Sequence, residues 1–267
     1  MKAAAMILAI LASPVFADED VLSFLAGQGC TVGPESYTEG LSDARITAFV
    51  QSALDDNLAV DTGDYTVLDA NICTMRLPEI EDAWSLDDPR IKAIISDIDA
   101  YPDDPGCYLS DLPRVFMDAY PGNSARANDE FIAFLAKHIA TGKVRFYSPD
   151  PLRTPVSWQV VRGACTEVPN IDNLIATHAY VTDANFDKYV RASGTDVPCS
   201  EGQSFTASQA ALEMQGVDLT TGEGPDHAIN AFLSMEFMIL AWAAGFRVDM
   251  TMQDRGRLRP PMCGLAQ

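Results

Sequence analysis

The sequence lacks the short motifs that mark common catalytic sites. It contains no G-x-S-x-G, H-E-x-x-H, S-x-x-K or Walker-type phosphate loop, which disfavours the enzyme classes that depend on them. Only three histidines occur, and none lies in a catalytic or metal-binding pattern. No two cysteines have C-x-x-C spacing and none is close to a histidine in sequence, so a zinc site or a redox dithiol is disfavoured. We therefore expect no metal ion and no cofactor.

Basic side chains are also scarce. The chain has 18 Lys and Arg against 38 Asp and Glu, a formal net charge of −20. So acidic a protein is not expected to bind nucleic acid or anionic lipid through broad electrostatics. Solubility is the simplest explanation of the charge, and the alternatives are a basic partner or a divalent cation held by the acidic surface.

The apolar run at the N-terminus, Ala3 to Ala12, is shorter than the ~20 residues that a membrane-spanning helix needs. Lys2 precedes this run, the helix breakers Ser13 and Pro14 follow it, and Ala17 is a small residue at the expected cleavage point. This order is typical of a cleavable secretory signal peptide. We expect residues 1–17 to be removed, and the remaining chain to work in the bacterial periplasm or outside the cell without spanning a membrane.

Six cysteines follow the predicted signal peptide, an even number that indicates three disulfides in an exported protein. The first segment between cysteines begins a helix at the N-cap Ser42 and ends it at Asn57, and residues 58–68 form a hairpin. The same order of helix, hairpin and cysteine recurs later, with helix stops at Gly142 and Gly245. Each copy also has a cysteine near its start. The spacing therefore predicts the pairs Cys30–Cys73, Cys107–Cys165 and Cys199–Cys263.

The predicted fold class is helix-rich α+β, built from two or three helix-plus-β-hairpin units, each linked by one disulfide. Such a unit resembles the second half of a winged-helix domain, although the acidic ends of its first helix would repel the phosphates of DNA. The expected boundaries are the signal peptide 1–17, unit 1 at 18–85, unit 2 at 86–172, a connector helix at 173–196 and unit 3 at 197–267.

Glu236 is the best single candidate for chemistry, because its neighbours on the predicted helix are apolar and a buried carboxyl has a raised pKa. An arginine could pair with it, and Arg247 is one candidate. Asp226 and His227 form a second weak candidate, since an acid beside an imidazole can raise its pKa, although Asp226 is more simply a helix N-cap. The weak candidates for binding an anionic ligand are the alternating arginines Arg255, Arg257 and Arg259. His138 and His178 are interpreted as helical residues at the edge of a core.

The leading functional hypothesis is an exported, non-enzymatic binding or structural protein of the bacterial cell envelope. Its partner would be another envelope protein or a small ligand. One alternative is a small periplasmic hydrolase that uses Glu236 or the Asp226/His227 pair, with the arginines lining an anionic substrate site. A second alternative is an acidic protein that binds divalent cations.

Overall fold

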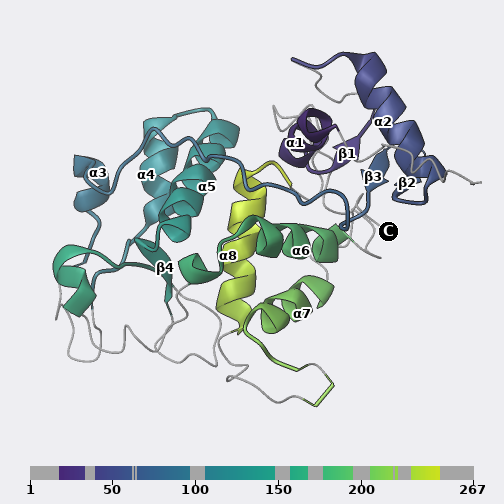
Figure 1. Ribbon diagram of the computed structural model, residues 1–267. Coiled ribbons are helices and arrows are strands. Elements are labelled where there is room, and N and C mark those ends of the chain that lie inside the picture. The colour runs from purple at the N-terminus through teal and green to yellow at the C-terminus, as the bar shows by residue number, and fades with distance from the viewer. Residues whose placement is uncertain are drawn as a thin grey trace, which may run out of the picture.

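The architecture was analysed in a computed structural model (Figure 1). It describes residues 18–33, 40–61, 63, 65–96, 106–147, 157–167, 177–194, 205–218, 220–221 and 230–246. The predicted signal peptide, Cys199, Cys263 and the arginines after Phe246 lie outside these ranges. Within them the protein is helix-rich with two small antiparallel sheets, as expected of the α+β class.

The N-terminal region contains α1 (Glu19–Gly27), β1 (Thr31–Val32), α2 (Asp43–Asp55), β2 (Ala59–Asp61) and β3 (Thr66–Leu68). Its three strands pair in the order β1-β3-β2, all antiparallel. Helix α2 begins as predicted, because the Ser42 hydroxyl accepts the Arg45 N–H at 3.4 Å and so satisfies one of the first-turn donors. Cys30 is bonded to Cys73, the first of the three expected pairs.

The middle region contains α3 (Pro89–Lys92), α4 (Leu112–Ala119) and α5 (Ser124–Ala140), then β4 (Val144–Tyr147), β5 (Ser157–Val160) and the short 3₁₀ helix η2 (Gly163–Glu167). Strands β4 and β5 form the expected hairpin. Residues 107–109 run along the other edge of β5, since Val160 N–H donates to Cys107 O and Leu109 N–H donates to Trp158 O. Cys107 is bonded to Cys165, the second expected pair.

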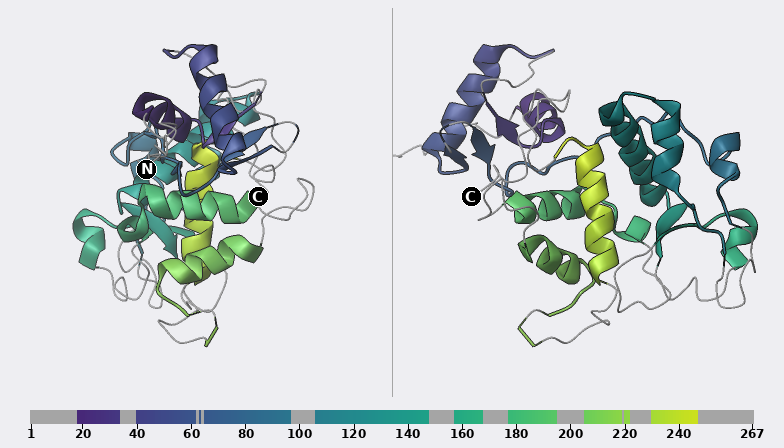
Figure 2. Two further views of the ribbon diagram at one scale, coloured as in Figure 1. Left: turned by 45° about the vertical axis from the view of Figure 1, so that its right-hand side comes forward. Right: turned by 180° about the vertical axis from the view of Figure 1, so that it is seen from behind.

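The C-terminal region is a group of three helices. The segment expected to be a connector helix contains η4 (Thr177–Tyr180) followed by α6 (Asp183–Gly194), and α7 (Phe205–Met214) and α8 (Asn230–Ala243) come next. Helix α8 lies between α4 and α5 on one side and α6 and α7 on the other (Figures 1 and 2). Helix α8 is covered by other helices on two sides, and Leu233, Phe237 and Leu240 are fully buried. This burial agrees with its sequence, which is apolar around most of the helix.

Five of the described helices, α1, α2, α5, α7 and α8, end with the same backbone geometry, and three of these ends fall at the predicted helix stops. After α2, α5 and α8, a residue with positive φ closes the helix: Asn57 (57°), Gly142 (68°) and Gly245 (92°). The next residue donates its N–H to a carbonyl five positions earlier: Leu58 to Ala53, Lys143 to His138 and Phe246 to Ala241, at 2.7, 2.8 and 2.8 Å. These are the Schellman-type ends that the helix stops predicted.

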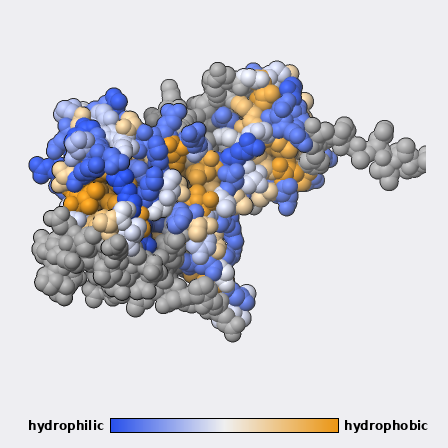
Figure 3. Space-filling view, turned by 60° about the vertical axis from the view of Figure 1, so that its left-hand side comes forward, coloured by the Kyte–Doolittle hydropathy of each residue, from blue (hydrophilic) through white to orange (hydrophobic). Residues whose placement is uncertain are grey.

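Few large apolar side chains of the described residues are exposed to solvent. Val60 and Met117, at 45% and 48% exposure, are the large apolar residues identified as exposed among the described residues. Figure 3 shows one face on which hydrophilic side chains divide the apolar surface into separate areas. In the described part of the chain, no helix has both the length and the apolar character needed to cross a bilayer.

Candidate binding groove between α1 and α6

An open groove of approximately 570 Å³ lies between α1, the extended segment around Cys73 and the first residue of α6. Its volume falls in the range of pockets that take small ligands or single side chains of a partner. The groove combines an apolar strip with charged and hydroxyl groups along its rim. Its lining consists of Glu19, Asp20, Leu22, Ser23, Ala26, Ile72, Cys73, Thr74, Arg76 and Asp183.

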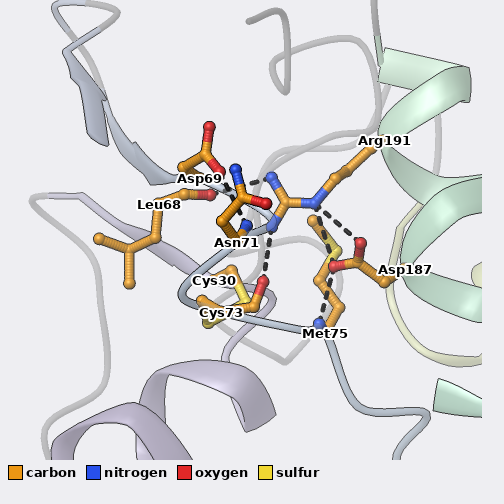
Figure 4. Close-up of polar contacts among 8 residues, drawn as sticks. All are labelled: Cys30, Leu68, Asp69, Asn71, Cys73, Met75, Asp187 and Arg191. Carbon is orange, nitrogen blue, oxygen red and sulfur yellow. Dashed lines mark hydrogen bonds and ion pairs between the residues drawn. A yellow bond between two sulfur atoms is a disulfide. The ribbon is translucent and has the colours of Figure 1, made fainter. Parts of the chain in front are cut away.

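A buried ion pair on α6 holds the extended segment in place (Figure 4). The Arg191 guanidinium donates from Nε to both Asp187 carboxylate oxygens at 3.0 Å. Its two terminal nitrogens donate to the carbonyl oxygens of Leu68 and Cys73 at 2.9 and 3.0 Å. Asp187 in turn accepts the Met75 N–H at 2.8 Å. Both charged side chains are buried, and each is compensated by the other and by the main chain.

Three further contacts fix the walls of the groove. The disulfide between Cys30 and Cys73 ties the segment to the end of α1. The Arg76 N–H donates to Ala26 O at 3.1 Å on the α1 side. On the α6 side, the Asp183 carboxylate accepts the Leu77 N–H at 3.0 Å. Because one segment is bonded to both helices, the groove is preorganised.

The rim of the groove is acidic. Glu19, Asp20 and Asp183 carry three negative charges there, and Arg76 carries one positive charge. The Arg76 guanidinium is partly engaged, since it donates to the Ser23 hydroxyl at 3.0 Å. Such a rim favours a cationic group in a ligand or partner.

A second groove, of approximately 410 Å³, separates residues 77–82 from the end of α5. Beside it lies a buried pair, His138 and Asp82, whose Nε2 and Oδ2 atoms are 3.9 Å apart. Neither of these two atoms has a hydrogen-bond partner among the described residues. Burial raises the pKa of Asp82. Burial, together with the charges of Lys143 and Lys137, lowers the pKa of His138 to about 4, so the imidazole is neutral at pH 7.

Glu236 is buried, with only 1% of its surface exposed; its apolar helical neighbours left open whether this side chain would be buried or lie at the edge of a groove. Burial raises its pKa to about 7. Arg145 on β4 is the charged group that opposes this shift, whereas Arg247, the partner considered from the sequence, lies outside the described residues. The carboxyl borders a cavity of only about 40 Å³. This volume holds one or a few water molecules but not an organic substrate.

The other predicted site residues can be placed only in part. Asp226, His227, Arg255, Arg257 and Arg259 lie outside the described residues. His178 lies in η4, not in a longer helix, and its ring is against Gly142. Among the described residues, no group of three or more His, Cys, Asp or Glu side chains is arranged to hold a metal ion.

Sequence reasoning missed Asp187 and Arg191. Their spacing of four residues on a helix is a signal of pairing, and the apolar neighbours Phe186, Tyr189 and Val190 indicate that this face is buried. Pairs with the same spacing are common on exposed helices, however. The sequence contains no sign that this pair bonds to carbonyl groups more than a hundred residues away.

The chain matches no family model, no curated protein and no solved structure. The class defined by the fold and the groove is therefore a helix-rich α+β protein with disulfide bonds, and its function is argued from the geometry of its own residues.

Proposed function

We propose that the protein is an exported, non-enzymatic binding protein of the bacterial cell envelope that uses the groove between α1 and α6. The observation that carries this proposal is the construction of the groove from segments far apart in the chain. Its walls are tied by the disulfide Cys30–Cys73 and by the buried pair Asp187–Arg191. A rigid, open and hydroxyl-containing groove supports binding of a partner's side chain or a small ligand.

The preferred partner presents a basic residue to the groove. The rim has a net negative charge, and the whole chain carries −20, so a basic protein surface would be attracted over a distance and then oriented at the rim. Leu22 and Ile72 provide the apolar contact for the aliphatic part of such a side chain.

Export to the periplasm, or secretion, after removal of residues 1–17 belongs to the same proposal. Two disulfides support it, since such bonds persist in oxidising compartments. The third pair, Cys199–Cys263, remains a prediction because both residues lie outside the described ranges.

We further propose that the chain consists of three related units of the winged-helix type. The junctions at the first cysteine of units 1 and 2 support this: Gly29-Cys30 and Gly106-Cys107 all have positive φ. In both units the cysteine carbonyl accepts an N–H from the last strand, from Leu68 in unit 1 and from Val160 in unit 2.

The outer face of α2 supports the same proposal. Ile132 and Ala136 on α5, which packs against α8, are buried. The matching positions on α2, Thr47 and Gln51, are polar and exposed. A polar outer face is expected of a terminal unit in a row of packed repeats, because no further unit covers it.

Site-specific photocrosslinking in cells tests the binding function. A photoreactive amino acid placed at Leu22, in the groove, is expected to give a discrete crosslinked product with one envelope protein. The same probe at Met117, an exposed residue on α4, is the matched control and is expected to give none.

A charge reversal adds specificity to this test. Glu19→Lys in the rim is expected to reduce the Leu22 crosslink at least about tenfold, whereas Asp118→Lys on α4 is expected to leave it unchanged. A crosslink that is equal at Leu22 and Met117, or that survives Glu19→Lys, would contradict the proposal.

The alternative functions have less support. For a hydrolase that uses Glu236, the carboxyl is buried beside a cavity that is too small for a substrate. The hydrolase hypothesis that uses Asp226 and His227, with arginines lining the substrate site, depends on residues outside the described ranges. Binding of a divalent cation depends on the overall acidity alone.

A further inference from the structure

The Glu236 carboxyl lies where α8, β4 and η4 meet. Its Oε1 accepts the N–H of Phe146 at 2.6 Å. Strand β4 is an edge of its two-stranded sheet, so the carboxyl occupies the position at which a further strand would accept that N–H. One side chain from the C-terminal helices thus accepts a hydrogen bond from the edge strand of the middle region.

Two charged or titratable groups face Glu236 across the small cavity. Arg145 comes from β4 and His178 comes from η4, and the Thr177 hydroxyl lies beside them. From α5 and from the residue that follows β5, the cavity is lined by the apolar side chains of Ile139 and Val161. The next residue of α8, Phe237, packs against Tyr189 of α6.

Burial and hydrogen bonding act on the pKa of the Glu236 carboxyl in opposite directions, and burial is the larger effect. Neither Glu236 Oε2 nor Thr177 Oγ1 has a partner in good hydrogen-bond geometry among the described residues, although the hydroxyl is close enough to influence the carboxyl. A protonated Oε2 is a donor, and it can satisfy Thr177 Oγ1 while Oε1 continues to accept from Phe146. The Thr177 hydroxyl can instead donate to an ionised carboxyl, and this bond and the Phe146 N–H lower the pKa. The ionised form nevertheless places a negative charge in a buried cavity, and this cost of burial outweighs the hydrogen bonds.

We propose that Glu236 is a proton-operated latch, which in its protonated form holds β4 and η4 closed against α8 and in its ionised form releases them. Opening exposes the carboxyl to water, where it ionises readily. The contact therefore tightens in acid and loosens at alkaline pH. A periplasmic protein would then change the coupling between its middle and C-terminal regions with the acidity of its surroundings.

The sign of the effect follows from linkage. Burial raises the pKa of Glu236 from 4.5 to about 7. A group with a raised pKa in the closed form stabilises that form fully below pH 4.5, and the stabilisation is lost as pH rises to about 7. Over that interval the opening equilibrium constant is expected to rise roughly a hundredfold. The positive charge of Arg145 across the cavity reduces this shift.

Amide exchange of Phe146 tests the latch directly, because its N–H is the group that Glu236 binds. In the whole protein, the opening constant derived from exchange is expected to increase about a hundredfold between pH ~5 and ~8 after correction for the intrinsic rate. The Val160 N–H, which donates to Cys107 O, is the internal reference and is expected to change little.

Two variants separate the latch from a general effect of pH. Glu236→Gln retains an acceptor for Phe146 and should abolish the pH dependence. Glu213→Gln removes a surface carboxylate that pairs with Lys188 and should retain it. Equal pH dependence in the wild type and Glu236→Gln would overturn the proposal. A Glu236 pKa below about 5, measured by NMR on the wild-type protein, would also overturn the proposal. This measurement does not depend on whether the variant folds.

Discussion

At the scale of single residues, the pair His138–Asp82 shows how burial without charge compensation shapes a core. The imidazole ring packs edge-on against Phe134, with ring centroids 4.6 Å apart. Asp82 Oδ1 accepts the Trp84 N–H at 2.8 Å, but its Oδ2 faces the imidazole beyond hydrogen-bond distance. Burial therefore shifts the pKa of each group toward its neutral form, upward for Asp82 and downward for His138.

His138 is expected to make the protein sensitive to acid. Its pKa is lowered from 6.5 to about 4 in the folded state, so the stability it contributes is present above pH 6.5 and is lost as pH falls toward 4. The wild type should lose about 2 kcal/mol more free energy of unfolding between pH 7 and 4.5 than His138→Phe. Urea denaturation at both pH values measures this difference.

Asp82→Asn is the control for that experiment. The pKa of Asp82 is raised, so its own contribution to stability changes with pH in the opposite direction, and removing it should make the acid sensitivity of the wild type steeper. If His138→Phe and the wild type lose the same free energy on acidification, the imidazole is not neutral in the folded protein.

The sequence predicted the surroundings of a side chain where its neighbours on the same helix form most of those surroundings. The apolar helical neighbours of Glu236 predicted a raised pKa, and the helical stripe around His138 predicted a packed imidazole. The partners of these groups were not predictable. Phe146 and Arg145 reach Glu236, and Asp82 reaches His138, only through the packing of segments that are distant in the sequence.

At the scale of elements, the turn after α5 is a position with no room for a side chain. Gly142 has φ of 68°, and a Cβ added there would lie 2.7 Å from the Nδ1 atom of His178. Its substitution combines backbone strain with a steric conflict against η4. Gly122 has a similar φ of 78° but open space around its Cα.

Gly142→Ala is therefore expected to destabilise the protein by about 1–3 kcal/mol more than Gly122→Ala. The two variants share the cost of a left-handed backbone conformation, and only the first has the clash with His178. Thermal and urea unfolding of both variants measure the difference. Equal losses would mean that η4 moves aside without cost.

The buried pair on α6 gives a prediction about how elements are joined. Arg191→Met leaves the Asp187 carboxylate buried without its guanidinium and removes the donors to Leu68 O and Cys73 O. The free energy of unfolding should fall by about 3–5 kcal/mol. Urea denaturation followed by tryptophan fluorescence measures it.

Arg114→Met is the matched control, because Arg114 pairs with Asp118 at the same spacing of four residues on α4 but on the surface. This variant should change the stability by less than about 1 kcal/mol. A comparable loss in both variants would show that burial and the bonds to the main chain are not what makes the α6 pair important.

At the scale of the whole molecule, the two disulfides join segments that lie far apart in the sequence. The bonds Cys30–Cys73 and Cys107–Cys165 close loops with sequence separations of 43 and 58. Replacing either pair by serine should lower the free energy of unfolding by about 4 kcal/mol in the chain-entropy model. Denaturation of each double variant under oxidising conditions measures this loss.

Peptide mapping without reduction tests the remaining pair in the same protein. The expected result is a peptide that contains Cys199 linked to one that contains Cys263. A bond from either residue to one of the other four cysteines would contradict both the pairing and the arrangement in three units.

The sequence by itself determined the helix-rich α+β class, the C-terminal ends of α2, α5 and α8 and the two disulfides seen in the described residues. These features depend on local signals: the cap at Ser42, the positive-φ positions Asn57 and Gly142, and the order of helix, hairpin and cysteine. Only the tertiary structure decided where α6 and α8 lie and what they bond to. The groove, the bonds from the Asp187–Arg191 pair to residues 68–75 and the Glu236 contact join residues about 90 to 160 positions apart. Such contacts depend on how whole helices and strands pack together. The hydrophobic effect that drives this packing is non-directional, so the sequence contains no pattern that identifies which two residues will meet.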